Sequence, residues 1–192
     1  MPTVASARSV AIRSGRCRRS VKPWALGALL KLLLLTAQRK DKVATMHWDD
    51  VRDGVWTIPT AKREKSNAKP PAVLDIINRQ PRIAGNPYVF ARRGTGPFNT
   101  LSQDRKNLDK KLGDMPPWVN HDLRRTAKTL MVCASIRPDI SERVLGHTIK
   151  GVAGTYDQHK YDDEKADALI RLAALVETII NPPSGNVVPL RA

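Results

Sequence analysis

The sequence contains only two cysteines, Cys17 and Cys133, among 192 residues. Two thiols cannot form the disulfide framework of a small secreted domain, so both are expected to be reduced in a cytoplasmic protein. Long apolar runs are also missing. The longest covers residues 24–37 and is interrupted by Lys31, whereas a membrane-spanning helix needs about 20 apolar residues. The sequence therefore predicts a protein that does not associate with membranes.

Acidic residues are absent from the first forty positions, which carry nine Lys and Arg side chains. The other positions hold 24 basic and 18 acidic residues, so the net charge of +15 divides into +9 and +6. A balance this basic favours a polyanionic partner, most simply nucleic acid. Residues 1–22 are expected to be a disordered basic arm. Its composition fits a transit peptide, a DNA-clamping tail, a non-native start upstream of the domain or a segment without a role. Residues 182–192 are expected to be a disordered tail.

Closely spaced metal ligands are missing as well. The candidate ligands His47, His159 and Cys133 lack the short spacing that a structural zinc site requires. We therefore expect neither a bound metal nor a cofactor.

The remaining pattern is mostly helical. In residues 121–135 apolar side chains recur on one face of a helix. Asp53-Gly54 lies among β-branched and aromatic residues, and this pattern predicts a hairpin over residues 48–59. The sequence thus predicts a mainly α fold with one small antiparallel β-sheet, in the α+β class. Helices are expected over residues 23–39, 41–46, 99–112, 121–135, 138–146 and 162–180, a polar turn over 60–71, a strand that leads into a helix over 73–80, and a short buried strand over 88–90.

Several side chains have the chemistry needed at a phosphodiester. His121 and Arg124 lie three positions apart on an expected helix, where a guanidinium can grip two phosphate oxygens and an imidazole can move a proton. Arg39, His147 and Tyr156 add a second cation, a second imidazole and a phenol that can act as a nucleophile. Each of them alone is equally typical of a helix end, a solvated surface or a core. Together with a lysine-rich loop, they are the parts for metal-free attack on a phosphodiester.

The order of these residues resembles the catalytic domain of tyrosine recombinases, the phage-type integrases. The similar strings are Leu-Leu-Leu-Leu-Thr-Ala-Gln-Arg at 32–39, Arg-Glu-Lys at 63–65, His-Asp-Leu-Arg-Arg-Thr at 121–126, Leu-Gly-His at 145–147 and Tyr-Asp-Gln-His at 156–159. The resemblance covers residues 24–180 and implies the catalytic-domain fold of DNA breaking-rejoining enzymes over residues 23–181. It also implies a site-specific recombinase acting on double-stranded DNA, as a homotetramer when full length, in the bacterial cytoplasm at the nucleoid. No small-molecule substrate is expected.

The resemblance implies a role for each site residue. Arg39 and Arg124 would clamp the scissile phosphate, and His147 would donate a hydrogen bond to a non-bridging oxygen. His121 would assist proton transfer and orient the phosphate. Tyr156 would attack the phosphorus and form a 3′-phosphotyrosyl link.

A lysine in the hairpin loop would protonate the leaving 5′ oxygen in the same scheme. The resemblance favours Lys65 for this role, but Lys62 and Lys69 share the loop, and the choice among the three stays open. Tyr161 is a rival nucleophile. Its spacing from His147 is too long, and a packing role is expected for it.

The sequence departs from the family pattern close to Arg39. Ala37 stands where a glycine is usual, and Lys42 stands where an acid normally helps to hold the active-site arginine and histidine. Asp41 is expected to replace that acid in part. Lys42 adds a like charge beside Arg39, and the activity is therefore expected to be weakened. The family's N-terminal core-binding domain has no counterpart in the sequence. The alternative expectation is therefore a truncated prophage remnant that binds DNA or recombinase protomers without catalysis.

Overall fold

The structure is a computed structural model that describes residues 23–58, 65–68, 71–91, 95–112, 114, 116–147, 156–157 and 159–182. The expected basic arm over residues 1–22 lies outside these ranges, as do residues 183–192 of the expected tail. The described chain forms helices and one small sheet, so the expected mainly α fold with an antiparallel sheet is confirmed. No helix in the described ranges has the length and apolarity needed to cross a membrane.

The elements follow the predicted order closely. The helices are α2 (Pro23–Thr36), α3 (Lys40–Ala44), α4 (Pro71–Asn78), α5 (Leu101–Leu112), α6 (Asn120–Cys133), α7 (Pro138–Leu145) and α9 (Asp162–Ile180), with a short 3-10 helix η1 (Trp48–Asp50) and strands β1 (Val51–Arg52), β2 (Val55–Ile58) and β3 (Lys65–Ala68). Helix α9 has the predicted bounds, and α5, α6 and α7 begin and end within two residues of theirs.

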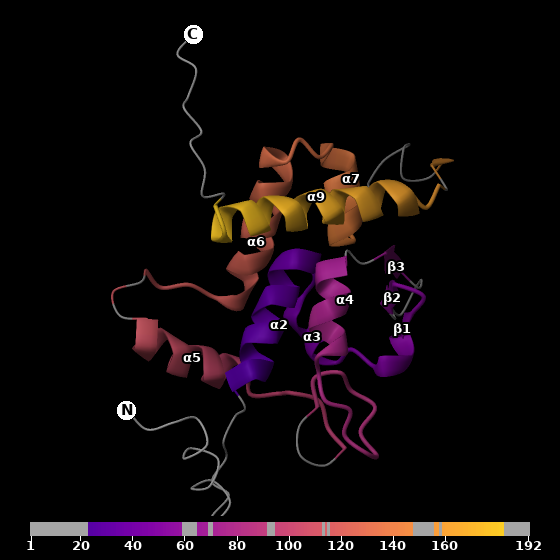
Figure 1. The fold of residues 1–192 in the computed structure, drawn as a ribbon. Helices are drawn as coiled ribbons and strands as arrows, with labels where there is room; N and C mark the ends of the chain where they lie inside the picture. The colour runs from indigo at the N-terminus through magenta and orange to yellow at the C-terminus, as the bar shows by residue number, and fades with distance from the viewer. Residues whose placement is uncertain are drawn as a thin grey trace, which may run out of the picture.

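Helix α2 lies at the centre of the fold (Figure 1). Leu29, Leu32 and Leu33 are each at most 1% exposed, which is typical of a helix buried on nearly all sides. Helix α2 contacts α4, α5, α6 and α9. The apolar run noted in the sequence is therefore the core of a globular domain.

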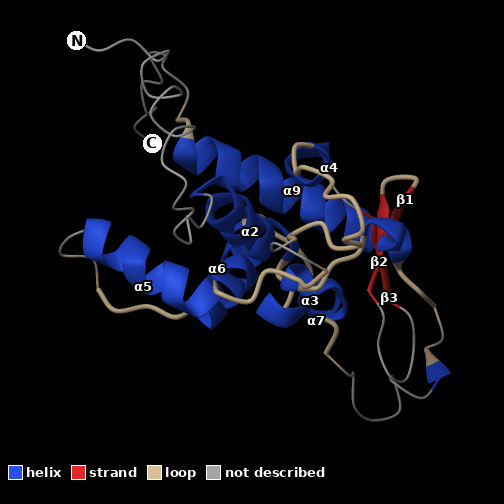
Figure 2. Ribbon diagram, turned by 90° about the horizontal axis from the view of Figure 1, so that it is seen from below, coloured by secondary structure: helices blue, strands red, loops and turns tan. Residues whose placement is uncertain are grey.

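The sheet has the order β1-β2-β3, and both strand pairs are antiparallel. Asp53 and Gly54 form the tight turn between β1 and β2 with positive φ angles of 48° and 75°, so the predicted hairpin is confirmed. Trp56 and Ile58 on β2 are buried and anchor the sheet to the core. In both views the sheet and α5 lie at opposite ends of the molecule (Figures 1 and 2). Strand β3 contacts α9, which also packs on α6 and α7.

Two predictions for the chain after the hairpin are wrong. Residues 73–80 do not begin as a strand, because α4 already starts at residue 71. Val73 and Ile77 are four positions apart and both buried, so the apolar spacing is helical. Residues 65–68 are not loop. They form β3 and pair with β2, because the sheet supplies backbone partners that a polar sequence does not reveal.

The short strand expected over residues 88–90 is also absent from the described chain. Tyr88 makes only an isolated antiparallel bridge with His47. Val89 and Phe90 are nevertheless buried, and the Val89 amide donates to Met46 O at 2.8 Å. The segment is thus a core-lining connection, held by single hydrogen bonds in place of a ladder.

The link between α2 and α3 has an unusual backbone and many hydrogen bonds. Ala37 is fully buried and has a φ of 54°, in the left-handed region. Thr36 Oγ1 donates to Leu32 O at 2.6 Å, and Gln38 Nε2 donates to Val144 O of α7 at 2.8 Å. The left-handed conformation explains why a glycine would suit position 37. It also ends α2 three residues earlier than predicted.

Replacing buried alanines by glycine tests whether the left-handed backbone at Ala37 is strained. Ala37 and Ala127 are both fully buried, but Ala127 lies inside α6. We expect Ala127→Gly to cost about 2 kcal/mol, because it removes a buried methyl group and places glycine in a helix. Ala37→Gly loses the same methyl group but also removes a left-handed penalty of about 1–2 kcal/mol. It should therefore stay within about 0.5 kcal/mol of the wild type in urea unfolding. Equal losses for both variants would contradict the strain at Ala37.

Candidate active site

The guanidinium of Arg124 is the centre of a buried polar cluster between α6, α7 and the α2–α3 link. Its Nη1 donates to Ala37 O at 2.6 Å, and its Nη2 donates to Leu145 O at 2.7 Å. Nη2 also lies 3.1 Å from His147 Nε2. Arg124 is only 6% exposed, and a buried charge persists only where hydrogen bonds satisfy it. These three contacts therefore fix the position of the guanidinium.

On helix α6, Arg124 and His121 differ in burial. Arg124 is buried on the same helix face as Ala127 and Met131, whereas His121 is exposed in the first turn. Asp122 accepts a hydrogen bond from the Val119 amide at 2.8 Å at the start of the helix. This backbone hydrogen bond is the main reason why the pKa of Asp122 lies below its ordinary value.

The positive charges of Arg124 and Arg39 repel each other at the cluster. Burial lowers the pKa of Arg124 below its ordinary value, and the positive charge of Arg39 lowers it further. Arg39 is exposed and caps the N-terminus of α3, where its carbonyl accepts from the amides of Lys42 and Val43. The mutual repulsion of the two cations would be relieved by an anion bound beside them.

The C-terminus of α7 brings His147 back over its own helix. Gly146 has a left-handed φ of 73°, the Gly146 amide donates to Arg143 O, and the His147 amide donates to Glu142 O, each at 3.0 Å. This pair of hydrogen bonds is the Schellman motif, in which the residue after the glycine contacts the residue five positions before it. Here these two residues are His147 and Glu142, and His147 Nδ1 lies against Glu142 Oε2.

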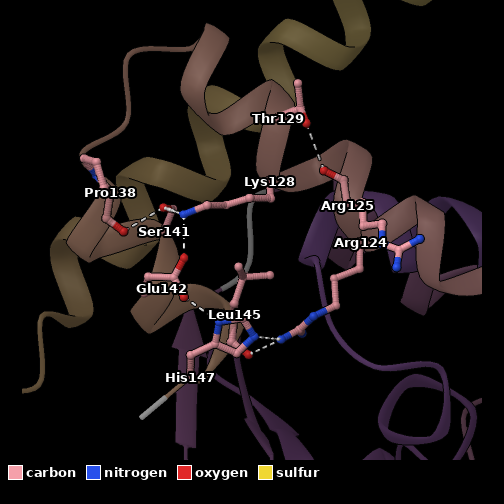
Figure 3. A network of polar contacts seen from close by, with 9 residues as sticks. All are labelled: Arg124, Arg125, Lys128, Thr129, Pro138, Ser141, Glu142, Leu145 and His147. Carbon is pink, nitrogen blue, oxygen red and sulfur yellow. Dashed lines mark hydrogen bonds and ion pairs between the residues drawn. The ribbon is translucent and has the colours of Figure 1, made fainter. Parts of the chain in front are cut away.

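Figure 3 shows that the network continues beyond Glu142. Lys128 Nζ on α6 lies 2.7 Å from Glu142 Oε1. Lys128 also donates to Ser141 Oγ, and Ser141 Oγ donates to Pro138 O at 2.8 Å. Hydrogen bonds from Lys128 and His147 hold the pKa of Glu142 below its ordinary value.

The acid beside His147 thus comes from α7. Asp41, which was expected to replace the missing acid in part, is 81% exposed and lies 3.8 Å from Lys40. Neither Glu142 nor Lys128 was predicted from the sequence. The signal for Glu142 was the helix-ending glycine, since a Schellman motif predicts a contact between residues 142 and 147.

Tyr156 is 80% exposed, and residues 148–155 before it lie outside the described chain. Asp157, the next residue, accepts from Arg143 of α7, which ties the tyrosine segment to the helix that carries His147. Within the described residues, neither His121 nor Tyr156 hydrogen-bonds through its side chain to Arg124 or His147. The structure therefore brings Arg124 and His147 into contact, with Arg39 near enough to act on Arg124 through its charge.

Lys65 is the first residue of β3, and its backbone pairs with Ile58 of β2. Lys65 was expected in the turn before this strand. Residues 59–64, which connect β2 to β3, lie outside the described ranges. The other two candidate lysines, Lys62 and Lys69, also lie outside the described chain.

Tyr161 has a packing environment, as expected. Its hydroxyl donates to Asp157 Oδ2 at 2.8 Å, and this hydrogen bond raises the pKa of the phenol above its ordinary value of 10.0. The Arg143 guanidinium lies 4.0 Å from the centre of its ring. A phenol that holds its proton more tightly and is covered in this way is a poor nucleophile.

The cluster is rich in N–H donors and cations, a composition suited to an anion. Among the residues that the structure describes, no three His, Cys, Asp or Glu side chains lie close enough to hold a metal ion. Arg39, Arg124 and His147 could together contact the oxygens of one phosphate group.

Replacing Gly146 by alanine tests the α7 terminus. The left-handed backbone penalises a side chain there, so Gly146→Ala should lower the free energy of unfolding by about 1–2 kcal/mol. Gly27 is a matched control, because it lies inside α2 with open space around an added Cβ. Gly27→Ala should stabilise the protein by about 1 kcal/mol. Stabilisation by both substitutions in urea unfolding would rule out the left-handed terminus.

The pH dependence of stability tests the Glu142 network. Because the folded-state pKa of Glu142 lies below its ordinary value of 4.5, its ionised form stabilises the folded protein above that pH. This contribution is lost as the pH falls through the lowered pKa. The melting temperature of Glu142→Gln should therefore fall below that of the wild type at neutral pH, and the difference should shrink in acid. A difference that stays constant down to about pH 3 would contradict the ionic network.

Comparison with known proteins places these features in a family. The family model for the phage integrase family matches residues 16–163. The prophage integrase IntF of Escherichia coli strain K12 is 25% identical over 179 residues, which cover 87% of this chain and 37% of that protein. The chain thus spans less than half the length of this relative.

Solved structures share the fold. The catalytic core of lambda integrase superposes with a TM-score of 0.53 at 22% identity, covering 67% of this chain and 86% of that one. An integrase from mycobacterium phage Brujita gives a TM-score of 0.60 at 17% identity, covering 90% of this chain and 58% of that one. The expected fold of a recombinase catalytic core is confirmed, and the family match over most of the sequence establishes that this chain belongs to the phage integrase family, the tyrosine recombinases.

Proposed function

We propose that the chain carries the catalytic domain of a site-specific DNA recombinase, over residues 23–181. It would cleave and rejoin DNA without a metal, through a 3′-phosphotyrosyl intermediate on Tyr156. The observation that carries this proposal is the buried guanidinium of Arg124, held beside His147 and within electrostatic reach of Arg39.

The two arginines and His147 form the proposed phosphate site. Arg39 depresses the pKa of Arg124, so their charges repel each other in the free protein. A phosphodiester between them replaces this repulsion with two attractions, and the attraction grows as charge builds on the non-bridging oxygens in the transition state. The carbonyls of Ala37 and Leu145 hold Arg124 in advance, which reduces the reorganisation needed during the reaction.

In the proposed reaction, Tyr156 Oη loses its proton with the assistance of His121 and attacks the phosphorus, and the bond to the 5′ oxygen breaks. The leaving oxygen takes a proton from a general acid, for which Lys65 is proposed on the family resemblance, with His121 assisting proton transfer. A 5′ hydroxyl from a second strand then attacks the phosphorus of the phosphotyrosine and breaks its bond to Tyr156 Oη. The proton of that hydroxyl returns to the general acid, and Tyr156 Oη takes up a proton as it leaves. Each cleavage is matched by a ligation, so the phosphodiester energy is retained in the tyrosyl link.

Double-stranded DNA is the proposed partner, and a homotetramer on DNA is proposed for a full-length protein. One lambda integrase structure of the same fold is a tetramer bound to a Holliday junction. The net charge of +15 is consistent with a DNA partner. The bacterial cytoplasm, at the nucleoid, is the proposed location.

A nicked suicide duplex tests the nucleophile, because loss of the short leaving strand traps the covalent intermediate. The chain has three tyrosines, so each can be replaced singly by phenylalanine. We expect denaturing gels to show covalent DNA with the wild type, Tyr88→Phe and Tyr161→Phe, and none with Tyr156→Phe. Trapping by Tyr156→Phe at the wild-type level would refute the assignment.

The same gels distinguish the recombinase from the alternative, a truncated remnant that binds DNA without catalysis. If the wild type traps no DNA but still gives a gel shift that weakens with salt, the chain binds DNA without cleaving it. This outcome would support the non-catalytic remnant.

A further inference from the structure

The environment of His147 defines which ring nitrogen carries the proton. Nε2 lies 3.1 Å from Nη2 of Arg124, and a guanidinium only donates hydrogen bonds. Nε2 therefore accepts as long as the ring keeps this contact, which leaves the ring proton of the free protein on Nδ1. Nδ1 in turn faces the Glu142 carboxylate, which only accepts when ionised.

We propose that Glu142 is a positioning residue for His147, and that Lys128 in turn positions Glu142. The inference rests on the proposed function, because it concerns how His147 meets the phosphate. By accepting a hydrogen bond from Nδ1–H, the carboxylate holds the ring with Nε2 towards Arg124. Any further proton on the ring is then carried by Nε2, the nitrogen that faces the phosphate.

The position of Glu142 depends on both of its carboxylate oxygens. Oε2 contacts His147, and Oε1 lies 2.7 Å from Lys128 Nζ, so each oxygen has one strong partner. Lys128 donates a hydrogen bond to Ser141 Oγ, and the Ser141 hydroxyl donates one to Pro138 O. The lysine thus joins α6, which carries Arg124, to α7, whose end carries His147 (Figure 3).

The groups around the His147 ring come from separate elements. Arg124 approaches from α6 and Glu142 from α7, while Lys128 and Ser141 act only through Glu142. A change in Glu142 therefore reaches the phosphate site through the tautomer and orientation of His147.

Nuclear magnetic resonance of 15N-labelled histidine tests the tautomer directly. We expect the His147 signals of the free wild-type chain to show protonation at Nδ1. Glu142→Ala should shift the population to the Nε2-protonated form. Asp139→Asn is the matched control, since it removes a carboxylate of the same helix whose partner is Arg137, and it should leave His147 unchanged. A wild-type ring protonated at Nε2, or an unchanged tautomer in Glu142→Ala, would overturn the proposal.

A double variant tests the same role of Glu142 even if Glu142→Ala fails to fold. In Glu142→Gln the amide offers one oxygen, for which Lys128 and His147 Nδ1 compete. Adding Lys128→Met removes the competitor, so the double variant should regain more Nδ1 protonation than Glu142→Gln alone. Lys128→Met by itself should change the tautomer less than Glu142→Ala does, because the carboxylate remains but has lost one of its two partners. Failure of the double variant to regain Nδ1 protonation would contradict the competition.

The cleavage rate links the tautomer to the reaction. At saturating suicide duplex, Glu142→Ala should trap DNA about tenfold to hundredfold more slowly than the wild type, as is common for partners of functional histidines. The dissociation constant for DNA should stay the same. Cleavage by Glu142→Ala at the wild-type rate would overturn the positioning role. If the wild type itself traps no DNA, the proposed function fails, and the resonance experiment alone decides the role of Glu142.

Discussion

A buried positive charge with fixed acceptors holds the active region of this protein together. Arg124 lies in the core face of α6, where an unpaired guanidinium would cost several kcal/mol, roughly the size of a domain's net stability. Its acceptors are the carbonyls of Ala37 and Leu145, which belong to two other segments. The α2–α3 link and the end of α7 are therefore constrained to meet at α6. Gln38 strengthens the same junction through Val144 O.

Helix α7 gives this junction its chemistry. Its left-handed terminus at Gly146 brings the His147 ring to Arg124 on one side and to Glu142 on the other. The next residue in the helix, Arg143, contacts Asp157 beside Tyr156. One short helix therefore holds both the histidine and the segment that carries the proposed nucleophile. Its inner residues Ile140 and Val144 are buried, which anchors the helix to the core.

Strongly periodic segments were predictable, and segments governed by distant partners were not. The bounds of α9 followed from its apolar repeat, and the Asp53-Gly54 turn followed from the need for positive φ. Strand β3 was missed because its polar sequence is stabilised by pairing with β2, which is a property of the neighbour. The early end of α2 was missed for a similar reason, since Ala37 takes a conformation that favours glycine.

The sequence by itself determined the class of the fold, the family resemblance and the types of residue available for phosphate chemistry. These depend on local periodicity and on the order of residues along the chain. The tertiary structure alone decided that Arg124 is buried, that Arg39 acts on it through charge, and that the acid beside His147 is Glu142 and not Asp41. Such contacts arise where helix ends meet in space, and the free energy of burying and pairing charges selects them.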